Sequence, residues 1–128
     1  MSDAILVLDI LSQIIEASND IKNKCKYAKC IEDFCDTEAG QEKLDSICIK
    51  LIAIGESLKN IDKITDKKLL IKYPQVNWKK IKGIRDFISH HYFDIDAEII
   101  YSICDKHIDG VIETLNLIQK DIKNDKKI

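Results

Sequence analysis

The segment IRDFISHHYF, residues 84–93, holds the side chains best suited to chemistry. Arg85 is the only arginine in the chain, and the other nineteen of the twenty basic residues are lysines. A guanidinium is a planar fork that can hold two oxygens of a carboxylate or phosphate, whereas an ammonium is a point charge. Arg85 is therefore a candidate phosphate-binding residue. The alternative is a structural ion pair in a lysine-rich chain.

Two histidines and a tyrosine follow this arginine closely. His90 stands five residues after Arg85, and His91 and Tyr92 come next. Histidine has an unperturbed pKa near 6.5, so it can transfer protons at cellular pH. The segment therefore combines a cation suited to phosphate with a group suited to acid–base chemistry.

The elements that position these residues are expected to be helices. The chain has 128 residues, 45% hydrophobic and 33% charged, with four glycines and one proline. This composition fits one helical domain over residues 1–128 and argues against a many-turned β fold or a disordered chain. The N-terminal apolar stretch is interrupted by Asp9 and is too short to span a bilayer, which predicts a cytosolic protein.

The cysteines show no pattern of a disulfide framework or a zinc site. Their number is odd and no C-x-x-C pair occurs, so we interpret them as small buried hydrophobes: Cys25, Cys30, Cys35, Cys48 and Cys104.

Apolar periodicity predicts an all-α antiparallel bundle of four long helices with one or two short extra helices. The first helix should run from about Asp3, capped by Ser2, into the middle twenties. The other expected segments are a short element around 30–38, a core helix over 41–60, a helix from Trp78 capped by Asn77, a helix starting at Asp94 or Asp96, and a last helix over 108–122 with a frayed tail from about 123.

Several single residues carry expectations about packing. Gly55 should let a neighbouring helix approach the core helix closely, and we interpret Glu56 beside it as a surface residue rather than a partner of Arg85. Thr65 is expected to cap a short helix before the proline turn. We interpret Tyr73 and Trp78 at that turn as packing residues, with base stacking as the alternative, and His107 as structural.

The charge is unevenly distributed although the net charge is only −2. Residues 63–85 hold eight basic groups and one acidic group. A stripe of one sign can attract a polyanion even on a slightly acidic protein, although a solvated lysine-rich surface would look the same.

The longest informative run is YPQVNWKKIKGIRDFISHHYFDID, residues 73–96. It resembles the HEPN superfamily and, within it, the HepT-like proteins, whose signature is R-x4-H-x-Y. The upstream IGESLKNI, residues 54–61, is similar to the "IGEA" helix of that family. The resemblance covers roughly residues 40–120.

The resemblance implies a HEPN-like homodimer that acts as a metal-independent endoribonuclease without a cofactor. Such proteins serve as toxins of type VII-like toxin–antitoxin systems, with RNA, including tRNA as a candidate, as substrate. Their partner is a nucleotidyltransferase antitoxin that transfers AMP to the motif tyrosine. Carried onto this chain, Arg85 and His90 are the catalytic pair and Tyr92 is the modified residue. The basic stripe supplies the RNA-binding candidates Lys79, Lys80 and Lys82.

The physical roles agree with this assignment. Metal-free RNA cleavage needs proton transfer, which His90 can supply, and a cation for the charge building on phosphorus, which Arg85 can supply. Residues five apart on an α-helix are about 140° apart around the axis. Either the helix ends before His90, or two subunits combine their residues in one site. The second arrangement is favoured. In an extended segment after the helix, His90 and Tyr92 would share one side and His91 would face the other.

A second function remains open. Other branches of the superfamily have lost catalysis, so the alternative is a non-catalytic binding module or partner subunit of a nucleotidyltransferase that holds nucleotide or RNA. The presence of Arg85, His90 and Tyr92 together favours the enzyme, because a binding module does not require a titrating histidine.

Overall fold

The computed structural model describes residues 3–90 and 96–125, with Ser89 and His90 described by their backbone alone. These ranges form the helices α1 (Asp3–Cys25), α2 (Glu32–Cys35), α3 (Glu38–Thr65), α4 (Trp78–His90), α5 (Ala97–Ser102) and α6 (Ile108–Asp125), with a 3-10 turn η1 (Leu70–Lys72) and a π-helical segment η3 (Ile103–His107). No strand occurs within them, so the all-α prediction is confirmed. None of the helices described is long and apolar enough to cross a membrane.

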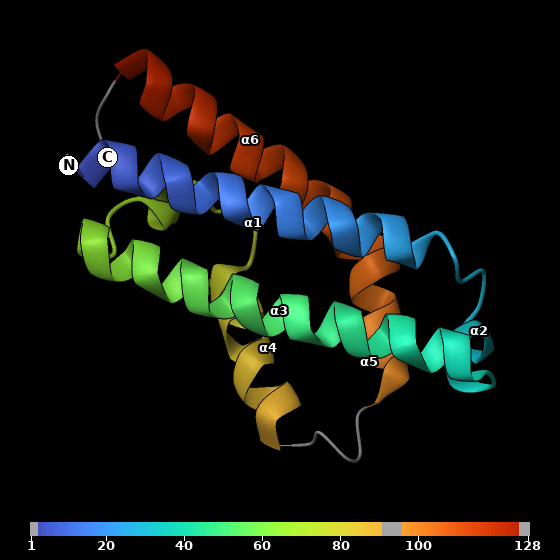
Figure 1. Ribbon diagram of the computed structural model, residues 1–128. Coiled ribbons are helices and arrows are strands. Elements are labelled where there is room, and N and C mark those ends of the chain that lie inside the picture. The colour runs from blue at the N-terminus through green and yellow to red at the C-terminus, as the bar shows by residue number, and fades with distance from the viewer. Residues whose placement is uncertain (1–2, 91–95, 126–128) are drawn as a thin grey trace.

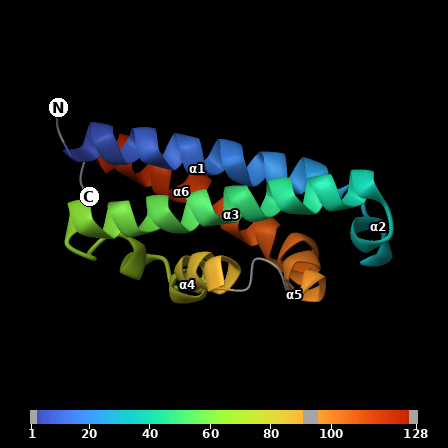
Figure 2. The same ribbon diagram turned by 60° about the horizontal axis from the view of Figure 1, so that its bottom comes forward.

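The long helices form the predicted antiparallel bundle. Helices α1 and α3 lie side by side and run in opposite directions, and α6 packs along α1 (Figure 1). The rotated view in Figure 2 shows α4 and α5 on the side of α3 that faces away from α1. Helix α4 packs mainly against α3. The helix that carries Arg85 is therefore an outer element of the bundle, held by the longest helix.

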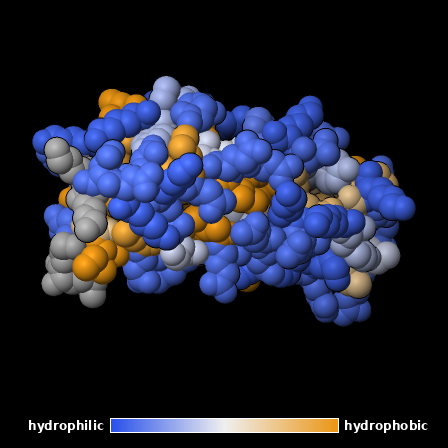
Figure 3. All heavy atoms as spheres, turned by 90° about the horizontal axis from the view of Figure 1, so that it is seen from above, coloured by the Kyte–Doolittle hydropathy of each residue, from blue (hydrophilic) through white to orange (hydrophobic). Residues whose placement is uncertain are grey.

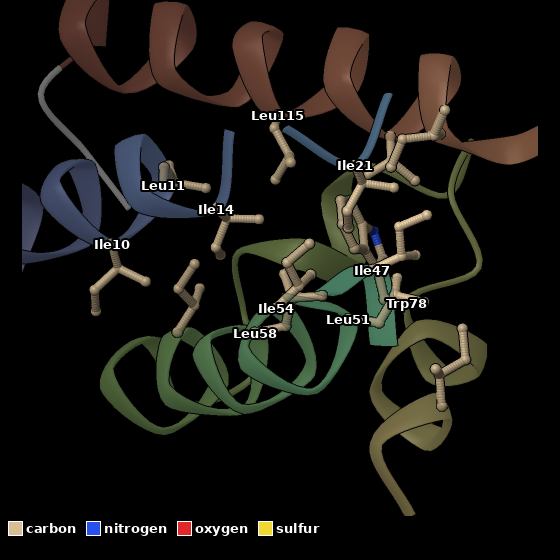
Figure 4. Close-up of a cluster of buried hydrophobic side chains, with 14 of the residues drawn as sticks. Ile10, Leu11, Ile14, Ile21, Ile47, Leu51, Ile54, Leu58, Trp78 and Leu115 are labelled. Carbon is tan, nitrogen blue, oxygen red and sulfur yellow. The ribbon is translucent and has the colours of Figure 1, made fainter. Parts of the chain in front are cut away.

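Aliphatic side chains fill the space between these helices. Ile14, Leu58 and Leu115 come from α1, α3 and α6 and are at most 1% exposed (Figure 4). Residues at three- and four-residue steps bring these side chains to one face of each helix. In α1, Leu11 and Ile14 are buried, whereas Ile5 near the start of the helix is 56% exposed.

The chain between α3 and α4 corrects the expectation for Thr65 and confirms the one for Asn77. Thr65 does not cap a following helix: it is the last residue of α3, and its hydroxyl donates to the carbonyl of Ile61 at 2.8 Å. Helix α3 ends there because Asp66 adopts the left-handed conformation, with φ of 54°. Asn77 caps α4 as predicted, accepting from the N–H of Lys80 at 3.1 Å.

Tyr73 and Trp78 pack this connection as expected. The indole of Trp78 is 7% exposed and donates to the carbonyl of Tyr73 at 2.9 Å. The hydroxyl of Tyr73 donates to Asp121 at 2.7 Å. Burial and this hydrogen bond raise the pKa of Tyr73 to about 12. The start of α4 is thus fixed to both its own loop and α6.

After the undescribed residues 91–95, the chain forms one bent helical arm. Asp96 caps α5 through the N–H of Glu98 at 2.9 Å, which confirms one of the two predicted starts. Helix α5 continues through η3 into α6 without leaving helical geometry. A π-helical segment widens one turn and bends the helix, so α5 and α6 point in different directions (Figure 1).

The cysteines correct the sequence interpretation. Cys25 and Cys104 form a disulfide that joins the end of α1 to η3, while Cys30 and Cys35 are exposed. Only Cys48 is a buried free thiol, and burial raises its pKa to about 11, so it stays protonated. The pairing depends on two segments that meet only in the folded chain, 79 residues apart.

Candidate active site

Arg85 lies in the middle of α4, where this helix crosses α3 most closely. A β-carbon added at Gly55 on α3 would lie 3.3 Å from the Arg85 β-carbon and 3.5 Å from the carbonyl oxygens of Ile81 and Lys82. Such spacing leaves room for glycine and little else. The expectation that Gly55 permits close helix approach is confirmed, and the contact it permits is with the candidate catalytic arginine.

Two carboxylates hold the Arg85 guanidinium. Its Nε lies 2.5 Å from Oε1 of Glu56, and its Nη1 donates to Oδ1 of Asp86 at 3.0 Å. The side chains of Arg85 and Glu56 are 41% and 52% exposed, so this is a solvated ion pair rather than a buried one. Lys59 adds a weaker contact, 4.0 Å from Asp86. Glu56 is a surface residue, as interpreted, but the expectation that it is not a partner of Arg85 was wrong.

Two residues at this site were therefore missed or misjudged. Asp86 follows Arg85 directly, and Glu56 follows the glycine at the helix crossing. The sequence did contain one indication of this contact. Gly55 was expected at a helix crossing, and the residue next to it, Glu56, can reach side chains on the crossing helix. Nothing in the spacing alone placed that contact at Arg85 rather than elsewhere on α4.

His90 is the last residue of α4, so the helix does not end before it. This removes the first of the two arrangements considered from sequence. Within the helix, His90 stands about 140° around the axis from Arg85. His90 is thus helical rather than part of an extended segment, and His91 and Tyr92 lie outside the described residues. The prediction that His90 and Tyr92 share one side required His90 to be extended, which it is not.

The three lysine candidates lie on two sides of α4. Lys79 and Lys82 line one hollow together with Lys59, Lys63 and Lys67. Lys80 lines a separate cavity on the other side of α4. Lys82 is paired with Asp62 on α3, and both side chains are largely buried. The three candidates thus divide into two that line a hollow between α3 and α4, together with Asp62 and Asp66, and one on the other side of α4.

The family assignment follows from comparison with known proteins. The family model described as Ribonuclease HepT-like matches residues 25–118, which include Gly55, Glu56, Arg85 and His90. The chain belongs to the HepT-like ribonuclease family. The resemblance noted from the sequence motif is confirmed, and the all-helical bundle is consistent with this family.

Individual relatives match most of the chain. A protein of Methanocaldococcus jannaschii, described as a candidate RNase, is 30% identical over 93% of this chain and 86% of its own. A second protein of the same organism with the same description is 29% identical over 88% of this chain and 87% of its own. A candidate ribonuclease HepT of Thermococcus cleftensis is 32% identical over 73% of this chain and 77% of its own. No solved structure matches the chain with statistical significance.

Proposed function

We propose that this HepT-like protein is a metal-independent endoribonuclease and the toxin of a type VII-like toxin–antitoxin pair. The observation that carries the proposal is the placement of the motif. Arg85 is partly exposed at the crossing of α3 and α4, and His90 ends the same helix. The family match supports ribonuclease activity as the class of reaction.

In this mechanism each residue has one role. His90 transfers the proton of the attacking 2′-hydroxyl or of the leaving oxygen, and Arg85 neutralises the charge on the phosphate. Because the two residues stand on different sides of α4, we propose that the site combines Arg85 of one subunit with His90 of its partner. Exposed apolar side chains also occur on α1 and α6: Ile5, Leu6 and Leu117. Because α1 lies on the side of α3 away from α4, they do not mark the interface that this composite site requires. The face of these two helices is otherwise mainly hydrophilic (Figure 3).

The RNA backbone is proposed to follow the hollow between α3 and α4. Lys79 and Lys82 line it from α4, and Lys59 and Lys63 line it from α3. Lysines along a groove attract phosphates without reading sequence. Since Lys82 is already paired with Asp62, Lys79 is expected to contribute more to RNA affinity. Lys80 contributes from the other side of α4.

Control of the toxin is assigned to Tyr92. We propose that a nucleotidyltransferase antitoxin transfers AMP to its hydroxyl. A nucleotide at this position adds negative charge and bulk close to His90 in the chain, which would repel an RNA phosphate.

One observation favours a non-catalytic binding module instead. Arg85 is engaged by Glu56 and Asp86, as expected of a structural ion pair. A module of this kind would bind RNA or nucleotide, or would act as the partner subunit of a nucleotidyltransferase, without cleaving.

The experiment that separates these functions is RNA cleavage by the purified protein in excess EDTA. Total RNA and tRNA are incubated with the parent, with His90→Ala and with His91→Ala, after light scattering has confirmed that each variant is dimeric. The enzyme should cleave in EDTA, His90→Ala should lose roughly 10² to 10⁴ in rate, and His91→Ala should lose much less. Binding of RNA without cleavage would support the module. Cleavage only with added metal would refute metal independence.

A further inference from the structure

A cavity of about 320 Å³ lies between α4 and the bent arm formed by α5, η3 and α6. Its walls are aliphatic: Leu51 and Ile54 on α3, Ile81 and Ile84 on α4, and Ile108 and Val111 at the start of α6. It exists because α4 packs mainly on α3 and leaves the side facing the arm uncovered. Its volume lies at the small end of ligand pockets, which span roughly 300 to 1,000 Å³.

One buried polar group lines this cavity without a partner. Ser18 on α1 is 0% exposed, and its hydroxyl has no hydrogen bond to any residue that the structure describes. A buried hydroxyl without a partner is unfavourable, and native proteins leave few of them. A ligand that reaches the inner end of the cavity with a polar atom would satisfy it.

The exposed residues that line the cavity are polar or basic. Lys80 on α4 and Lys106 and His107 in η3 are exposed, and none forms an ion pair with a described residue. Gln75 and Asn77 line the same side, and the amide nitrogen of Asn77 remains available because only its oxygen caps α4. The mouth is therefore suited to an anion, and the interior is suited to an apolar body with a polar edge.

We propose that this cavity binds one ribonucleotide of a single-stranded RNA, base first. The base lies between the aliphatic walls with its polar edge toward Ser18, and its phosphate lies near Lys80 and Lys106. The inference rests on the proposed ribonuclease function, because it assigns a substrate subsite beside the candidate active site. Single-stranded RNA is commonly read by base insertion and hydrogen bonds to the base edge.

Simpler ligands fit the same observations less well. Inorganic phosphate would use the basic mouth but leave the apolar walls empty. An aliphatic acid would cover the walls but leave the Ser18 hydroxyl unsatisfied. A nucleotide uses all three features.

The cavity and Arg85 share helix α4. Ile84 lines the cavity and is the residue before Arg85, so the two side chains stand about 100° apart on neighbouring sides of the helix. A strand anchored in the cavity would therefore cross α4 beside the arginine. The anchored base would fix which phosphate reaches Arg85, which makes the cavity a determinant of cleavage position.

Two glycines allow a matched test. Gly110 on α6 lines the cavity and Gly83 on α4 does not, and a β-carbon added at either meets no atom within 4 Å. The β-carbon of Gly110→Phe therefore meets no atom and starts a phenyl ring at the cavity wall, and Gly83→Phe adds the same side chain to a helix elsewhere. Ser18→Ala removes the hydroxyl while keeping the walls, and it should not lower stability because the hydroxyl has no partner to lose.

The measurement is methyl NMR of isoleucine-labelled protein titrated with each of the four ribonucleoside monophosphates and with a short single-stranded RNA. Saturable shifts of Ile81, Ile84 and Ile108 are expected with the RNA and with at least one monophosphate. Gly110→Phe should weaken binding at least tenfold, Gly83→Phe should retain it, and Ser18→Ala should weaken it about three- to tenfold.

The proposal is overturned if the RNA causes no saturable shift of these methyl groups, if binding survives in Gly110→Phe, or if a free monophosphate binds at least tenfold more tightly than the RNA. The last result would mark a site for a free nucleotide. Cleavage of total RNA by the same samples keeps the two proposals apart. Cleavage without binding in the cavity refutes the subsite alone, and binding without cleavage refutes the ribonuclease alone.

Discussion

Replacing Arg85 by lysine separates the two interpretations of this residue. If Arg85 is only a structural ion pair, the charge is what counts and lysine keeps it. If Arg85 holds the scissile phosphate with two N–H groups, lysine cannot match both oxygens at once. The same substitution is therefore nearly neutral under one interpretation and severe under the other.

The structure sets the size of each effect. Arg85 and its carboxylate partner Glu56 are about half exposed, and ion pairs of this kind contribute roughly 0 to 1 kcal/mol. Arg85→Lys should therefore lower the melting temperature by no more than about 5 °C. Loss of one preorganised donor to the transition state should reduce the cleavage rate by about 10² to 10³, equivalent to about 3 to 4 kcal/mol.

Glu56→Gln provides the matched control. It breaks the same ion pair from the other side and leaves the guanidinium intact. Its cleavage rate is expected to stay within about tenfold of the parent, because the phosphate-binding fork remains. Single-turnover cleavage of tRNA, thermal melting and light scattering are measured for both variants. Cleavage by Arg85→Lys at the parental rate would refute the phosphate role, and an equal loss in Glu56→Gln would assign the effect to the ion pair.

Three further predictions concern regulation and stability. Incubation with ATP and the cognate nucleotidyltransferase should add one AMP to Tyr92, seen by mass spectrometry, and abolish cleavage; adducts only at other residues would contradict the proposed control. Gly55→Leu should lower the free energy of unfolding by roughly 1 to 3 kcal/mol because α4 must move away from α3, whereas Gly83→Leu has open space and should not. Reduction of the disulfide between Cys25 and Cys104 should lower the free energy of unfolding by roughly 2 to 4 kcal/mol, since it closes a long loop; identical denaturant curves with and without reductant would show that the bond does not form.

Local features of the fold were predictable because they depend on neighbouring residues. Asn77 predicted the start of α4 because it directly precedes the first helical residue. Gly55 predicted a close helix approach because it lies within the apolar pattern of α3. The errors concern contacts made only after folding. Thr65 was predicted to cap a following helix, but its hydroxyl bonds back to Ile61 within α3, and the helix ends at Asp66 in the left-handed conformation.

The same reason explains the parts of the site that sequence did not supply. Glu56 and Arg85 are far apart in the chain, and only the crossing of α3 and α4 brings them into contact. The disulfide between Cys25 and Cys104 depends on the bend at η3, and no pattern of residues in the sequence predicts that bend. The motif itself needed no tertiary information, since Arg85 and His90 share one helix.

The ion pair and the phosphate site, which were alternatives in the sequence, are compatible in the structure. A guanidinium has five N–H donors, and Glu56 and Asp86 engage Nε and Nη1. Nη2 has no partner among the residues that the structure describes, and Nη1 retains a second N–H. A phosphate can therefore approach the outer end of the fork while Glu56 still holds Nε. In that arrangement the carboxylate does not compete with the substrate but fixes the direction of the fork, so the contact with Glu56 is compatible with catalysis as well as with a purely structural role.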